Sequence, residues 1–143
     1  MKTSDLFVKC LENEGIEYIF GVPGEENADF LMSLHESKKI KFILTRHEQG
    51  AAFMAESYGK LTGKLSCCLS TLGPGATNLL TGVADANMHH SPVLVITGQG
   101  SSDRLHKESH QIMDVCHMFK SVTKWTTSVR NPATIPEIVR KAV

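Results

Sequence analysis

The chain has 143 residues, of which 41% are hydrophobic and 21% charged, and its formal net charge is +0. This length suits a single domain, and the composition is ordinary for a folded globular protein. The balanced charge, the polar start and the lack of a long apolar run lead us to expect no nucleic-acid partner, no signal peptide and no membrane span.

Helical and strand-like segments alternate along the chain. In order, we expect a helix ending at Gly15, a strand over 16–22, a helix containing Phe30 and Leu34, a strand over 41–45 and a helix over 48–61. A strand over 64–71, a helix over 76–88, a strand over 93–97, a short helix near 109–118, a strand over 122–129 and a final helix over 132–143 follow. Repeated βα units of this length predict an α/β fold, a doubly wound parallel β-sheet flanked by helices over residues 1–143.

The four cysteines have no paired spacing of the kind that zinc or redox motifs require. Cys67 and Cys68 are adjacent within an apolar strand-like run. We therefore expect reduced, buried thiols and a cytoplasmic protein.

Polar and glycine-rich loops follow the first four predicted strands, at 21–25, 46–49, 72–75 and 98–100. Parallel strands place such loops at one edge of the sheet, where ligands bind in open α/β folds. Glycine-rich turns are also a general need of parallel sheets, which explains about half of these glycines without any ligand.

Glu48 is the carboxylate that stands where the second strand ends and the next helix begins. Taken alone, it is best explained as an acidic residue in a first helical turn, where it complements the helix dipole. A ligand ring bound at this edge would give it a second role.

Two other patterns point to chemistry only weakly. The run Gly73-Pro74-Gly75-Ala76-Thr77-Asn78 looks like a phosphate loop, but Asn78 replaces the third glycine of the dinucleotide fingerprint. The histidine pairs His106/His110 and His89/His90 lack a third ligand in sequence, so we predict no metal site from them.

Taken together, several motifs resemble the thiamine-diphosphate-dependent enzymes, in the order and spacing of their N-terminal, pyrimidine-binding domain. Within that family the chain most resembles acetolactate synthases. The motifs lie at 21–24, 46–52, 58–59, 73–78, 92–99 and 110–114, with Phe119 and Thr123-Lys124 beyond them.

The resemblance implies that the Glu48 carboxylate hydrogen-bonds N1′ of the cofactor aminopyrimidine and favours its imino tautomer, which leads to deprotonation of C2 of the thiazolium. The activated cofactor then decarboxylates a 2-oxo acid such as pyruvate, and an acetolactate synthase adds the two-carbon unit to a second pyruvate. The same resemblance implies that Pro23, Gly24, Pro74 and Asn78 line the pyrimidine or substrate pocket. Gln111, and with less support His110, would reach the substrate. Turn geometry is the competing explanation for Pro23, Gly24 and Pro74, and an exposed amide for Gln111.

Family members bind the diphosphate and its Mg²⁺ in a C-terminal domain that starts with Gly-Asp-Gly, a motif that does not occur here. We therefore expect a fragment of a longer enzyme, with the middle and diphosphate-binding domains elsewhere. Alone it would be inactive and bind the cofactor weakly. Bound FAD cannot be inferred, because its site would lie in the middle domain.

The resemblance also implies a homo-oligomer, a dimer or tetramer, in which the diphosphate-binding domain of a neighbouring subunit completes the site. Small and apolar residues on the helices from Gln49 and Ala76 are candidates for that interface or for the core. They are Ala51, Ala52, Ala55, Leu79, Leu80, Val83 and Ala84. Two alternatives stay open: part of another 2-oxo-acid decarboxylase, or a non-catalytic assembly module with the same fold.

Overall fold

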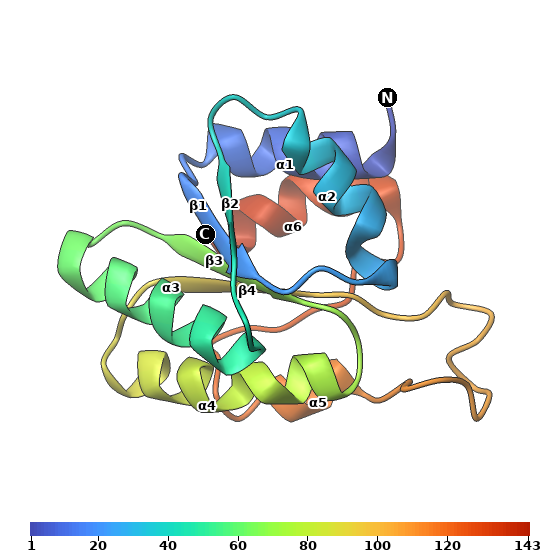
Figure 1. Cartoon of the computed structure of the whole chain (residues 1–143). Coiled ribbons are helices and arrows are strands. Elements are labelled where there is room, and N and C mark those ends of the chain that lie inside the picture. Colours follow the sequence, from blue (N-terminus) through green and yellow to red (C-terminus); the bar gives the residue numbers. More distant parts are fainter.

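The computed structural model describes all residues, 1–143, and its centre is a four-stranded parallel sheet (Figure 1). The strands are β1 (Tyr18–Gly21), β2 (Lys41–Leu44), β3 (Ser66–Ser70) and β4 (Val93–Thr97), in the order β2-β1-β3-β4. From β1 the chain passes to one side for β2 and then returns across the sheet to β3. The carboxyl ends of β1 and β3 therefore flank the point where the winding changes direction, which is where such sheets bind ligands.

Helices cover both faces of this sheet (Figure 1). One face carries α1 (Thr3–Asn13), α2 (Ala28–His35) and α6 (Ile135–Ala142), and the other carries α3 (Glu48–Thr62), α4 (Pro74–Met88) and α5 (Val115–Phe119). Parallel crossovers are right-handed, so connections that run in opposite directions along the sheet place their helices on opposite faces. The α/β fold with a parallel sheet flanked by helices is thus confirmed.

Alternation along β3 divides the core into two halves. Cys67 belongs to the hydrophobic cluster beneath α1, α2 and α6, and its neighbour Cys68 belongs to the cluster beneath α3, α4 and α5. Both thiols are fully buried, and burial raises the pKa of Cys68 to about 12 and that of Cys67 well above its usual value. The expected burial is confirmed at these two positions but not at Cys10 and Cys116, which are half-buried, and none of the four cysteines forms a disulfide.

The C-terminal third differs from the prediction in two places. The segment over 122–129 is not a strand, because no neighbouring strand pairs with it. The helix expected near 109–118 begins only at Val115, where the Asp114 carboxylate accepts a hydrogen bond from the His117 N–H at 2.9 Å. The final helix is confirmed, as a short 3-10 turn, η2 (Pro132–Thr134), that leads into α6.

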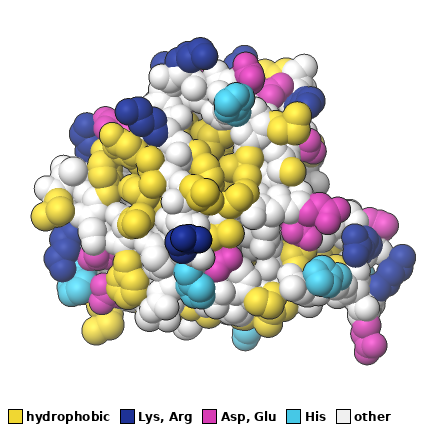
Figure 2. Space-filling model, in the orientation of Figure 1, with side chains coloured by type: hydrophobic (Ala, Val, Ile, Leu, Met, Phe, Trp, Pro, Cys, Tyr) yellow, Lys and Arg dark blue, Asp and Glu magenta, His cyan; other side chains and the backbone are white.

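The small residues on α3 and α4 lie mainly inside the molecule. Ala51, Ala52, Ala55, Leu79 and Val83 are all buried, so they form the core between the two helices and the sheet rather than an interface between subunits. The exposed apolar surface lies elsewhere: Figure 2 shows hydrophobic side chains in the middle of the face where edge strand β2 runs, and Leu44 at the end of that strand is 67% exposed. None of the helices has the length and apolar character needed to cross a bilayer.

Candidate functional site

Four loops meet at the carboxyl edge of the sheet, as the positions of the polar motifs predict. Backbone hydrogen bonds join them: the Val22 N–H donates to Leu69 O at 3.3 Å, the Thr45 N–H to Gly21 O at 2.9 Å and the Gly98 N–H to Ser70 O at 2.9 Å. Each bond links the residue after one strand to the end of the neighbouring strand. The rim is therefore a continuation of the sheet.

Glu48 is the first residue of α3, and two polar residues before it fix its place. The buried Thr45 hydroxyl donates to the His47 carbonyl at 3.2 Å. His47 Nδ1 then accepts a hydrogen bond from the Gln49 N–H at 3.2 Å and caps the helix. The cap is thus supplied by a neighbour, which leaves the half-buried Glu48 carboxylate free for other contacts.

The Glu48 carboxylate points towards the start of α4. Its Oε2 accepts a hydrogen bond from Asn78 Nδ2 at 3.0 Å, and Oε1 makes no hydrogen bond within the protein. A Cβ atom placed on Gly75 would come within 3.3 Å of Oε1 and 2.9 Å of Thr71 Oγ1. The glycine therefore lets the start of α4 pack closely against the carboxylate, while Oε1 can still accept a further hydrogen bond.

The loop that carries Gln111 lies against the turn after β3. Gly73 adopts φ +55°, and a Cβ on it would lie 2.6 Å from the Gln111 carbonyl oxygen and 2.7 Å from Gln111 Cβ. Gln111 itself has φ +55°, unusual for a residue with a side chain. The contact brings a segment distant in sequence to the same rim as Glu48 and Asn78, with the Gln111 side chain exposed.

The other predicted site residues occupy less specific positions. Pro23 and Pro74 are exposed at the rim, Gly24 is half-buried, and Pro74 opens α4, where a missing N–H costs nothing. His110 is exposed and makes no hydrogen bond. The structure thus brings Glu48, Asn78, Gly75 and the Gln111 loop together, and it assigns no contact of this kind to His110.

Asn27 is a rim residue that the sequence did not reveal. It is 4% exposed, its Oδ1 accepts a hydrogen bond from the Gly24 N–H at 2.9 Å, and its Nδ2 donates to Val22 O at 3.2 Å. The amide thereby closes the loop after β1 into a fixed shape. Asn27 follows Gly24 by three residues, the spacing of a local side-chain turn, and this was the only signal in the sequence.

The similarity to known proteins extends over most of the chain. Residues 1–118 match the family described as thiamine pyrophosphate enzyme, N-terminal TPP binding domain. The chain belongs to this family.

Its relatives agree with that assignment. The chain is 40% identical over 142 residues to the probable acetolactate synthase large subunit of Methanocaldococcus jannaschii, with 99% of this chain and 24% of the relative covered. It is 41% identical over 140 residues to the acetolactate synthase of Bacillus subtilis, covering 97% and 24%. It is also 39% identical over 136 residues to the putative thiamine pyrophosphate-containing protein YdaP of Bacillus subtilis, covering 94% and 24%. This member of the thiamine pyrophosphate enzyme family therefore spans about a quarter of the length of these relatives.

Proposed function

We propose that this chain is the aminopyrimidine-binding part of a thiamine-diphosphate-dependent 2-oxo-acid carboligase or decarboxylase. The reaction proposed for the whole enzyme is that of acetolactate synthase, in which two pyruvate molecules give 2-acetolactate and carbon dioxide. The observation that carries this proposal is the Glu48 carboxylate, held at the carboxyl edge of the sheet with one oxygen bonded to Asn78 and the other unbonded.

The residues around Glu48 fit an aromatic nitrogen heterocycle. Gly75 lets the start of α4 approach the carboxylate closely without covering Oε1, and Gly73 lets the Gln111 loop close over the same turn. In this proposal Glu48 and Asn78 bind the polar edge of the pyrimidine, and Pro23, Gly24 and Pro74 border it. When bound, thiamine diphosphate supplies the electron sink for cleavage of the bond between the carbonyl and carboxyl carbons of the 2-oxo acid.

The role proposed for Glu48 is to share a proton with a ring nitrogen of the pyrimidine. Asn78 donates only to Oε2, so it orients the carboxylate without using the second oxygen. Gln111 is proposed to contact the 2-oxo acid from the neighbouring loop, and His110 remains a weaker candidate for the same pocket.

The remaining parts of the enzyme are proposed to lie in other domains. A middle domain and a diphosphate-binding domain with Mg²⁺ would complete it, and the diphosphate-binding domain would come from a neighbouring subunit. In support, the chain covers only 24% of the length of its acetolactate synthase relatives. Without the charge-assisted contacts to the diphosphate, this chain alone should be inactive.

The test is Glu48→Gln in the intact enzyme. Glutamine keeps the size of the side chain but cannot hold the charge or take the proton, so hydrogen–deuterium exchange at C2 of the bound cofactor should slow by a factor of about 100 or more. The matched control is Glu36→Gln, which changes the same charge on an exposed residue at the end of α2. An unchanged rate of exchange at C2 in Glu48→Gln would contradict the role that we propose for Glu48.

A second candidate function has its own support. The relative YdaP, whose name specifies only thiamine pyrophosphate, is as similar to this chain as the acetolactate synthases are. The domain therefore also fits another 2-oxo-acid decarboxylase. Incubating the intact enzyme with pyruvate distinguishes the two candidate functions, because a carboligase forms acetolactate and a simple decarboxylase releases acetaldehyde.

A further inference from the structure

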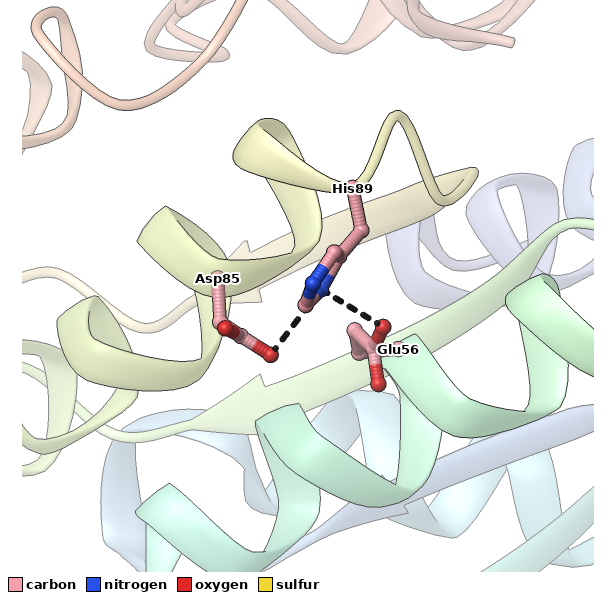
Figure 3. Close-up of side chains that lie close together, drawn as sticks. All are labelled: Glu56, Asp85 and His89. Carbon is pink, nitrogen blue, oxygen red and sulfur yellow. Dashed lines mark ion pairs between the residues drawn. The ribbon is translucent and has the colours of Figure 1, made fainter.

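A second polar cluster lies between the middle of α3 and the C-terminal end of α4, away from the rim (Figure 3). Glu56 comes from α3, and Asp85 and His89 come from the last turns and the end of α4. His89 Nδ1 lies 3.4 Å from Glu56 Oε1 and 3.4 Å from Asp85 Oδ2. The proposed function uses none of these residues.

The spacing of the three side chains matches what a metal ion requires. One nitrogen and two carboxylate oxygens all lie within 4.8 Å of one another. Ligand atoms about 2.0–2.1 Å from a tetrahedral Zn²⁺ lie about 3.3 Å apart, close to the two 3.4 Å separations here. Imidazole nitrogen and carboxylate oxygen are both ordinary zinc ligands.

Glu56 is fixed in place before any ligand binds. It is 5% exposed, and its two oxygens accept hydrogen bonds from the Ser91 hydroxyl at 3.1 Å and the Ser57 hydroxyl at 3.2 Å. Such outer hydrogen bonds orient metal-binding carboxylates. The side chains of Asp85 and His89 make no hydrogen bond, so the carboxylate oxygens of Asp85 and the ring nitrogens of His89 are available to bind a metal ion.

The competing explanation is a protonated His89 shared between two carboxylates. Lys60 Nζ, 3.8 Å from Glu56 Oε1, would add a second positive charge to that arrangement. The two explanations differ in what Lys60 does. In an ion-pair cluster the Lys60 ammonium group stabilises the two carboxylates, whereas in a metal site it repels the incoming cation.

We propose that Glu56, Asp85 and His89 form a binding site for a divalent transition metal of the Zn²⁺ class, with a fourth position left to water. The metal would join the middle of α3 to the C-terminal end of α4, the two helices whose first turns carry Glu48 and Asn78. Because it binds the folded chain, it should also raise the unfolding temperature of the protein.

The test is titration of this chain with Zn²⁺ by calorimetry, repeated with Co²⁺ followed by absorption spectroscopy. We expect one ion per chain, and at least about tenfold weaker binding in His89→Gln and in Asp85→Asn. The matched control is His90→Gln, which alters the exposed neighbouring histidine and should leave the affinity unchanged. Lys60→Met should tighten binding by roughly two- to fivefold, the range that a half-exposed ion pair is worth.

Three results would overturn the proposal. The first is no saturable binding at one equivalent. The second is binding that His89→Gln and Asp85→Asn leave unchanged, or that His90→Gln weakens equally. The third is thiolate-to-Co²⁺ charge-transfer bands, which would place the ion at Cys10 or Cys116, the cysteines that are not fully buried. Circular dichroism of each variant establishes that it has kept the fold.

Discussion

Glu48 is distinguished by the small residues that surround its carboxylate. Asn78 satisfies Oε2, while Oε1 faces the place where Gly75 has no side chain. Glu48 is the first residue of α3, and the residue before it, His47, caps that helix. This arrangement keeps one strong acceptor available at the rim, and the position of the carboxylate depends on the absence of a side chain at Gly75.

Gly75→Ala tests that close fit directly. A methyl group would lie 2.9 Å from Thr71 Oγ1 and 3.3 Å from Glu48 Oε1, so it would displace the carboxylate that we propose binds the pyrimidine. Alanine favours a helix by about 1 kcal/mol over glycine, which offsets the close contact with the Thr71 side chain. We expect a change of less than about 1 kcal/mol in the free energy of unfolding, but about 100-fold lower turnover in the intact enzyme.

Gly50→Ala is the matched control for the helical propensity in that prediction. Gly50 lies on α3, and a Cβ on it would meet no atom within 4 Å. Urea unfolding should show a gain of about 0.5–1 kcal/mol. Full turnover in Gly75→Ala would mean that the position of the Glu48 carboxylate does not depend on the glycine.

At the scale of elements, the packing of α3 against α4 fixes the positions of Glu48 and Asn78 relative to each other. The two helices touch at three successive levels, which are Glu48 with Asn78, Ala52 with Gly82, and Glu56 with His89. The residue numbers rise together, so the helices run parallel. Because the middle level consists of alanine and glycine, the backbones approach closely, and the position of Glu48 relative to Asn78 follows from packing farther along the helices.

Gly82→Ala should separate these helices. The added Cβ would lie 2.6 Å from Ala52 Cβ and 3.0 Å from the Phe53 backbone nitrogen, and backbone cannot move aside as a flexible side chain can. Overpacking of this kind outweighs the gain in helical propensity, so we expect urea unfolding to show a loss of about 1–3 kcal/mol. Gly50→Ala, the same chemical change on α3, should move stability in the opposite direction. A stabilised Gly82→Ala protein would show that the two helices are free to slide.

Glu17 links three elements and gives the fold a dependence on pH. Its carboxylate accepts hydrogen bonds from Lys64 Nζ at 2.6 Å and the Tyr58 hydroxyl at 3.0 Å, and the Lys64 contact is the main cause of its lowered pKa. Folding favours the charged form, so the stabilisation is complete above the ordinary value of 4.5 and is lost as the pH falls through the lower pKa of the folded state.

Lys64→Met should therefore reduce the loss of stability on acidification. Without the ammonium group, the folded-state pKa of Glu17 moves back towards 4.5, and the free energy of unfolding should fall less steeply below that pH. Urea unfolding at a series of pH values measures the slope. Lys38→Met, at an exposed lysine outside any ion pair, is the control, and an identical acid slope in both variants would contradict the prediction.

The elements that sequence predicts well are those specified by local pattern. All four strands, and the start of α3 at Glu48, follow from apolar runs and the turn residues between them. The segment over 122–129 has strand-like residues but no partner strand, because pairing depends on distant parts of the chain. The burial of Glu56 was equally hidden, since a glutamate on a helix is ordinarily exposed and only the packing of α4 covers it.

The same distinction applies to the candidate site. Convergence of the loops could be predicted, because parallel strands fix which ends share an edge. The hydrogen bond from Asn78 to Glu48 could not, since it depends on how closely α3 and α4 approach. The contact between Gln111 and Gly73 depends on two positive φ angles in segments almost forty residues apart, and no local pattern encodes that pairing.

For the molecule as a whole, exposed apolar side chains mark the surface that is a candidate for contact with a second copy of the chain. The alanines of α3 and α4 are used in the core, but the outer side of α3 carries exposed apolar side chains of its own. Met54 and Leu61 are seven residues apart on that helix, share one face, and are 46% and 85% exposed. Large exposed apolar side chains grouped on one surface are typical of association sites.

We therefore predict that this chain self-associates through the outer face of α3. Light scattering at high protein concentration should give a mass above the 15.7 kDa of the monomer. The double variant Met54→Glu/Leu61→Glu places two charges on that face and should return the mass to that of the monomer, because burying unpaired carboxylates opposes association. Met32→Glu is the matched control, since Met32 is 61% exposed on α2, which covers the opposite face of the sheet. If Met32→Glu dissociates the oligomer and the α3 variant does not, the interface lies on the side of α1 and α2. A monomeric mass for the unaltered chain at high concentration would contradict the prediction.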